Sequence, residues 1–247
     1  MRKLYLLAGS LLLFSVACKA PFYQADTVVA KRQTLDATSP TNSAGDLAEA
    51  TITPYREQLT EAMTEVIGQA ETTLFKNDGE STLGNWVTDL LYDQAVAIFP
   101  DEQIDFAIAN SGGLRINELP AGPVRMEDMY RLMPFDNELV LVALNGVVFE
   151  EFLSYMAAKW QGWPQSRQLR YRIEDGQAVD IKVNGEPPLL NRNYLVAMPD
   201  YVANGGDDAE MLADRPQIKS GLLIRDLLIK AIKEGAPVNA TLDGRIE

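Results

Sequence analysis

Three short loops contain side chains whose chemistry could bind a small polar ligand. The first is Asn110-Ser-Gly-Gly-Leu-Arg115, where two glycines let the backbone approach a ligand and the arginine supplies a planar fork of five donors. The second is Pro134-Phe-Asp-Asn137, which places an aromatic ring and an amide just before an apolar segment. The third is Asp200-Tyr-Val-Ala-Asn-Gly-Gly-Asp207, which combines an aromatic ring, a glycine pair and a carboxylate. Taken singly, each loop has an ordinary explanation as a turn, a packed ring or a solvated acid.

The composition excludes several kinds of catalytic site. The 247 residues include no histidine and one cysteine, so the sequence has no Ser-His-Asp triad, no histidine-bound zinc and no internal disulfide. A metal site would have to use carboxylates, carbonyl groups and water. With 35 acidic and 22 basic residues, the net charge is −13, which argues against a nucleic-acid partner. The charge balance therefore predicts no nucleic-acid partner.

The hydrophobic pattern predicts an α+β domain over residues 51–247, with a mixed β-sheet and flanking helices. Thr53-Pro54 is typical of a helix start, with Tyr55 and Leu59 on the apolar face that follows. Ser220 is expected to cap the last helix. The predicted helices are 53–67, 82–98, 125–133, 147–160 and 220–234, and the predicted strands are 104–109, 139–144, 169–173, 179–183, 194–198 and 238–246.

The first residues are typical of an export signal. Arg2 and Lys3 precede the apolar run Leu4–Ala17, and the single cysteine, Cys18, follows it. Residues 1–17 therefore resemble a bacterial lipoprotein signal peptide, which would make Cys18 the lipidated residue; the alternative is a plain secretory signal with an incidental cysteine. Residues 18–50 have the composition of a flexible tether. We expect a bacterial cell-envelope protein that is lipid-anchored to a membrane and faces the periplasm or the cell exterior.

Further motifs accompany the three loops in a specific order. Glu80-Ser-Thr-Leu-Gly-Asn85 precedes them and Asp243-Gly-Arg-Ile246 follows them. Residues 52–247 thereby resemble the C-terminal, substrate-recognition domain of the 5'-nucleotidase/UDP-sugar hydrolase family. The resemblance implies a 5'-nucleotidase C-terminal-domain-like fold and a nucleobase bound between Phe135 and Tyr201.

The resemblance also implies roles for the other loop residues. Asn137 would approach the base, Asp207 would bind ribose hydroxyls, and Arg115 would face the ribose and phosphate with Asn110 beside it. Stacking on an aromatic ring is worth roughly 1–3 kcal/mol per base, and an arginine can grip a phosphate with two hydrogen bonds. The expected substrate-binding residues are Asn110, Gly112, Gly113, Arg115, Phe135, Asn137, Tyr201, Gly205, Gly206 and Asp207.

The sequence departs from the family pattern in two respects. The family's catalytic half is a metallophosphoesterase domain that uses histidines, which this sequence lacks. The resemblance therefore implies no catalytic residue and no metal ligand among these residues. The arginine usual before the Glu80 motif is replaced by the stretch Lys76-Asn-Asp-Gly79, where Lys76 could substitute as a point charge.

These departures lead to three hypotheses. The first is a nucleotide- or nucleoside-recognition subunit of a 5'-nucleotidase-type phosphohydrolase, acting with a separately encoded metallophosphatase in nucleotide catabolism. Under this hypothesis the chain itself binds no cofactor, and divalent metals are bound only by the partner. The second is a stand-alone nucleoside- or nucleotide-binding lipoprotein. The third is a structural protein that has lost the ligand, which the retained aromatic, amide and acidic side chains disfavour.

Overall fold

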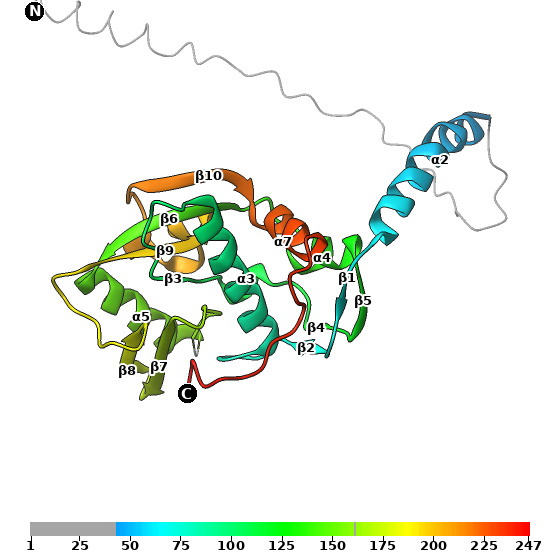
Figure 1. Cartoon of the computed structure of the whole chain (residues 1–247). Coiled ribbons are helices and arrows are strands. Elements are labelled where there is room, and N and C mark those ends of the chain that lie inside the picture. The colour runs from blue at the N-terminus through cyan, green and yellow to red at the C-terminus, as the bar shows by residue number, and fades with distance from the viewer. Residues whose placement is uncertain (1–42, 161) are drawn as a thin grey trace, which may run out of the picture. The chain divides into compact units, whose positions relative to one another are not determined.

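The computed structural model describes residues 43–160 and 162–247 (Figure 1). The expected signal peptide, Cys18 and residues 19–42 of the expected tether lie outside the described residues. Within the described ranges, no helix is long and apolar enough to cross a membrane. The helices are α2 (Ser43–Thr64), α3 (Thr82–Ile98), α4 (Met126–Leu132), α5 (Gly146–Trp160), α6 (Asp200–Ala203) and α7 (Ile224–Lys233).

The compact unit of residues 51–247 contains one four-stranded sheet and three two-stranded ones. In the large sheet the order is β10-β6-β9-β3; β6 is antiparallel to β10 and β9, whereas β3 is parallel to β9. This mixed sheet with flanking helices confirms the predicted α+β class. The strands are β1 (Val66–Ala70), β2 (Leu74–Phe75), β3 (Phe106–Ala107), β4 (Glu118–Leu119), β5 (Gly122–Arg125), β6 (Glu138–Asn145), β7 (Leu169–Glu174), β8 (Gln177–Val183), β9 (Asn193–Pro199) and β10 (Gln217–Leu223).

The middle of strand β6 is an unbroken apolar run because both faces of the large sheet are covered. Leu139 and Leu141 belong to a core that includes residues of α3 and α7. The alternate residues Val140 and Val142 belong to a second core that includes residues of α5. A strand directs successive side chains to opposite faces, so such a run is expected where helices cover both. Figure 1 shows α3 and α7 on one side of β6 and β9, and α5 on the other.

Most predicted elements of the unit are present close to their expected bounds. In α3 the Ser81 hydroxyl caps the helix by accepting a hydrogen bond from the Gly84 N–H at 3.1 Å. The apolar residues on the inner face of α3 are buried, namely Leu83, Trp86, Val87, Leu90, Leu91 and Ala95.

The first predicted helix was wrong at both ends. Helix α2 begins at Ser43, contains Pro54 and ends at Thr64, and the residues after it form strand β1. Ser43–Ala50, placed in the tether from its composition, is therefore helical; alanine is the strongest helix former and is frequent in this stretch. Tyr55 and Leu59 are exposed and do not form the expected core face.

The end of the chain also differs from the prediction. Ser220 lies in strand β10, which pairs with β6, so the last helix begins at Ile224 instead. Tertiary strand pairing overrides the capping tendency of serine here. Residues 238–246 contribute only isolated bridges, from Val238 to Ala70 and from Ile246 to Tyr171, and form no strand. The strand predicted at 104–109 shortens to Phe106–Ala107.

Candidate nucleoside-binding site

The large sheet brings the three loops to one edge. Leu139 at the start of β6 lies opposite Pro199 at the end of β9, because these strands are antiparallel. Ala107 at the end of the parallel strand β3 lies beside Ala197 of β9. Each loop therefore leaves or enters the sheet at the same edge. There they surround a cavity of about 300 Å³, which is lined by Asn110, Gly112, Gly113, Arg115, Phe135, Asn137, Tyr201 and Asp207.

The cavity thus gathers eight of the ten residues expected to bind substrate. The other two are Gly205 and Gly206, which line an adjoining concavity together with Asn137, Asp200 and Tyr201. Sequence order alone could not place these segments side by side, because Asn110 and Asp207 are separated by 97 positions.

The two aromatic side chains of the cavity are half-exposed. Phe135 has 49% and Tyr201 has 45% of its surface accessible, so neither is a core residue. The guanidinium carbon of Arg115 lies 5.8 Å from the centre of the Phe135 ring. Each ring therefore keeps an apolar surface available at the cavity, as a stacking surface for a flat ligand requires.

The carboxylate of Asp207 is held from two sides. The Tyr201 hydroxyl donates to Oδ1 at 3.0 Å, and the Asn110 amide donates to Oδ2 at 2.7 Å. The Tyr155 hydroxyl of α5 donates to the backbone carbonyl of Asp207. Asp207 has a positive φ of 53°, which is unusual for a residue other than glycine. Each carboxylate oxygen has a second lone-pair direction, so the fixed carboxylate can still accept hydroxyl groups from a ligand.

Two of the glycines are required by close packing. A Cβ atom at Gly113 would lie 2.8 Å from the Oδ1 atom of Asn110. A Cβ atom at Gly206 would lie 2.5 Å from both the ring and the carbonyl oxygen of Tyr201. Any larger residue would displace the side chains that line the cavity.

The cationic side of the site consists of Arg115 and Lys76. Arg115 forms no ion pair with another described residue and donates to the Gly112 carbonyl at 3.2 Å. Lys76 donates to the Leu114 carbonyl at 2.7 Å, in the same loop. Burial and the neighbouring charge of Arg115 lower the pKa of Lys76, while Asp78 opposes the shift. Two mutually repelling cations beside the cavity favour an anionic ligand group.

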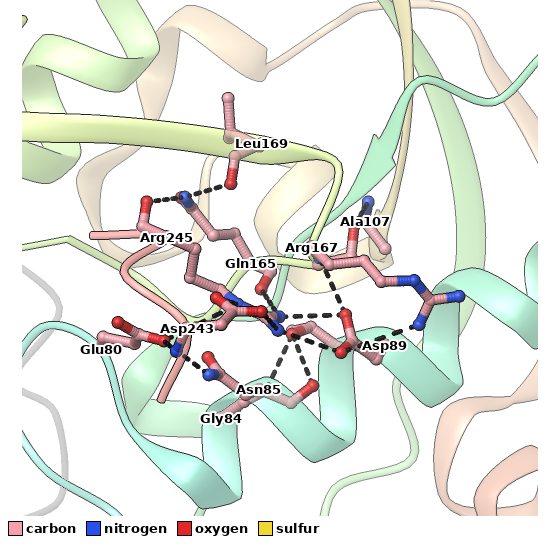
Figure 2. Close-up of polar contacts among 12 residues, drawn as sticks. Glu80, Gly84, Asn85, Asp89, Ala107, Gln165, Arg167, Leu169, Asp243 and Arg245 are labelled. Carbon is pink, nitrogen blue, oxygen red and sulfur yellow. Dashed lines mark hydrogen bonds and ion pairs between the residues drawn. The ribbon is translucent and has the colours of Figure 1, made fainter. Parts of the chain in front are cut away.

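The motifs at the two ends of the sequence pattern form a separate, structural cluster (Figure 2). The buried Arg245 guanidinium donates to both oxygens of Asp89 at 2.9 and 3.1 Å, and to both oxygens of Asp243 at 3.0 and 2.8 Å. Glu80 accepts from the side-chain amide of Asn85 at 2.8 Å and from the backbone N–H of Asp243 at 2.7 Å. These residues hold the C-terminal segment against α3 and do not line the cavity.

Two residues that support the site received no role from the sequence. Asp200 contacts both aromatic loops, and Tyr155 holds the backbone of Asp207. An acid at the start of a short helix was a usable signal for Asp200, whereas no sequence signal pointed to Tyr155. In the described part of the chain, no three His, Cys, Asp or Glu side chains gather in a way that could hold a metal ion. The described residues thus do not fit a divalent metal ion.

Comparison with known proteins identifies the family. The model of the 5'-nucleotidase C-terminal domain matches residues 65–214. The chain belongs to this family. Protein UshA of Escherichia coli K12 is 26% identical over 145 residues, which are 56% of this chain and 26% of UshA. A 5'-nucleotidase of Vibrio cholerae is 26% identical over 149 residues, which are 59% of this chain and 27% of that protein.

Two solved structures share the fold of this chain. The 5'-nucleotidase precursor of Thermus thermophilus superposes with a TM-score of 0.68 and 28% identity, covering 82% of this chain and 43% of that one. The NAD nucleotidase of Haemophilus influenzae shares the fold with a TM-score of 0.57 and 19% identity, covering 81% of this chain and 41% of that one. The chain spans about a quarter of the length of these curated relatives and less than half of these solved structures.

Proposed function

We propose that this chain is a nucleotide- or nucleoside-recognition subunit of a 5'-nucleotidase-type phosphohydrolase. The observation that carries the proposal is one cavity lined by two half-exposed aromatic rings and a pre-oriented carboxylate, Phe135, Tyr201 and Asp207. A nucleoside has the complementary chemistry, with a flat base for the rings and ribose hydroxyl groups for the carboxylate.

The remaining residues of the cavity extend this recognition along the ligand. Asn137 supplies an amide that can hydrogen-bond the edge of the base, beside the ring of Phe135. Arg115 supplies a positively charged guanidinium group, whose paired N–H donors can bind a phosphate group on the ribose with two hydrogen bonds. Stacking tolerates different bases, so the proposed ligand class is nucleosides and nucleotides in general.

The proposal assigns the chemical step to a separately encoded metallophosphatase in nucleotide catabolism. The similarity to proteins named 5'-nucleotidase supports this class of reaction, and the match covers only about a quarter of their length. The divalent metals and the activated water would belong to the partner, and this chain would position the base and ribose. The proposed location is the bacterial cell envelope, with a lipid anchor on Cys18 that faces the periplasm or the cell exterior.

Reconstitution with a metallophosphatase that lacks this domain tests the proposal. Adding the chain is expected to raise hydrolysis of nucleoside monophosphates and to leave p-nitrophenyl phosphate hydrolysis unchanged, because recognition acts through the nucleoside. Equal stimulation of both substrates would contradict a recognition role. Metal-dependent phosphate release by the purified chain alone would contradict the assignment of the chemistry to a partner.

A stand-alone nucleoside- or nucleotide-binding lipoprotein is the second candidate. The hydrogen bonds that orient the Asp207 carboxylate come from this chain alone, which favours this candidate, because no second protein is needed to orient that group. Tight nucleoside binding together with no stimulation of any metallophosphatase would support this candidate and contradict the recognition subunit.

A further inference from the structure

The two aromatic loops of the cavity are joined by one carboxylate oxygen. Oδ1 of Asp200 accepts a hydrogen bond from the backbone N–H of Glu138 at 3.0 Å and another from the N–H of Tyr201 at 2.8 Å. Glu138 follows the loop that carries Phe135 and Asn137, whereas Tyr201 carries the second ring itself. Asp200 therefore bridges two segments that are more than sixty positions apart in the sequence.

Helix α7 also holds the loop that carries Phe135, with contacts at both ends of the loop. The Ile224 N–H donates to the Asn137 carbonyl at 2.9 Å. The buried Arg225 guanidinium pairs with Asp136 at 2.7 Å and donates to the Met133 carbonyl at 3.2 Å. These contacts fix this loop to the domain, and Leu139 is paired with Pro199 in the sheet. The bridge through Asp200 extends that link beyond the paired ends of β6 and β9 to the two aromatic loops.

We propose that Asp200 is a positioning residue that sets the separation between the rings of Phe135 and Tyr201. The inference rests on the proposed function, in which a nucleobase stacks between these rings. Carbon atoms in contact lie about 3.5–4.0 Å apart, and dispersion attraction falls steeply with a gap of even 0.5–1 Å. A small displacement of one loop therefore removes one of the two stacking contacts while the ribose and phosphate contacts persist.

Asp200 lines the adjoining concavity but not the main cavity. Its two hydrogen bonds to backbone N–H groups are the means by which it acts on the loops. An amide at this position retains a side-chain oxygen that can accept both N–H groups, whereas alanine retains none. Asp200→Asn is therefore the conservative variant and Asp200→Ala the disruptive one. Asp128→Ala is a matched control, because Oδ2 of Asp128 accepts the Arg125 N–H at 2.8 Å at the start of α4, away from the cavity.

Calorimetric titration of the full chain with adenosine and with ribose 5-phosphate tests the proposal. Asp200→Ala is expected to weaken adenosine binding about tenfold, since base stacking supplies a comparable factor. Binding of ribose 5-phosphate is expected to change by less than about twofold, because that ligand has no base to stack. Asp200→Asn is expected to restore adenosine affinity, and Asp128→Ala to leave both affinities unchanged.

Three outcomes in the Asp200 variants would overturn the positioning role. They are wild-type adenosine affinity in Asp200→Ala, equal weakening of adenosine and ribose 5-phosphate binding, and no recovery in Asp200→Asn. Loss of adenosine affinity in Asp128→Ala to the same extent would also overturn it, because the effect would then follow from the loss of any helix-terminal carboxylate.

Amide hydrogen exchange without ligand separates failure of this inference from failure of the proposed function. In Asp200→Ala the N–H groups of Glu138 and Tyr201 are expected to exchange faster, and in Asp200→Asn at nearly the wild-type rate. Unchanged exchange at both amides would overturn the bridge itself. If the unsubstituted protein binds neither adenosine nor ribose 5-phosphate, the proposed function is wrong, while the exchange rates still decide whether Asp200 links the loops.

Discussion

Replacing Arg245 by methionine should destabilise the domain strongly. The guanidinium is buried and donates to Asp89, to Asp243 and to the carbonyl of Gln165 at 2.9 Å, so methionine leaves several acceptors without this donor. Breaking a buried pair by removing one partner costs about 3–5 kcal/mol. Here both carboxylates keep another cation, because Arg167 lies 3.7 Å from Asp89 and Arg170 lies 3.4 Å from Asp243. We therefore expect a loss at the lower end, about 3 kcal/mol.

Thermal and urea denaturation of the full chain would measure the effect. A loss of about 3 kcal/mol in a unit of this size lowers the melting temperature by roughly 6–12 °C. Arg131→Met is the matched control, since the Arg131 side chain is 69% exposed and its ion pair with Asp128 spans 3.7 Å; surface substitutions usually change stability by less than about 0.5 kcal/mol.

The loss of stability in Arg245→Met is expected to depend on pH, because its partner Asp243 is a titratable carboxyl group. Burial tends to raise the pKa of Asp243, but the hydrogen bond and charge of Arg245, with the charge of Arg170, lower it below the ordinary value. A carboxyl with a depressed pKa in the folded state contributes stability above its unfolded pKa, and this contribution disappears as the pH falls through the folded pKa. The difference between Arg245→Met and the unsubstituted protein should therefore be full at pH 7 and smaller below about pH 4. A loss under about 1 kcal/mol at pH 7, or a loss that does not shrink in acid, would refute this reasoning.

Three further results are expected. Gly206→Ala should destabilise the domain by about 1–3 kcal/mol in a urea melt, because its Cβ would lie 2.5 Å from Tyr201; a neutral effect would show that the loop can move aside. Tyr201→Phe removes a hydrogen bond to Asp207 and should weaken riboside binding by about 0.5–1.5 kcal/mol in calorimetry while sparing free bases; equal losses for both would count against the role of the hydroxyl. Cys18→Ala should release the protein from the membrane fraction in cell fractionation, and unchanged partition would contradict the lipid anchor.

The sequence pointed to residues that line the cavity more clearly than to the residues that support them. Phe135 and Tyr201 could be assigned to one cavity because the ordered motifs resemble the 5'-nucleotidase C-terminal domain, and in the structure both side chains are half-exposed and line one cavity. Arg245 could not be recognised as buried, since charged residues are almost never fully buried unless paired, and its partner Asp89 lies 156 positions away. The start of α2 was missed because Pro54 after a threonine is typical of a helix start, although this helix continues through it.

The central claim is that Phe135 and Tyr201 bind a nucleobase between them. Titration of the full chain with adenosine, and of Phe135→Ala, Tyr201→Ala and Asp207→Asn, tests it most directly when each variant is also melted. Each aromatic truncation should weaken adenosine binding by roughly 1–3 kcal/mol with little change in melting temperature, because each ring is half-exposed. Their effects should not add, and Asp207→Asn should weaken ribosides but not free adenine. A large fall in melting temperature with unchanged adenosine affinity would contradict the account.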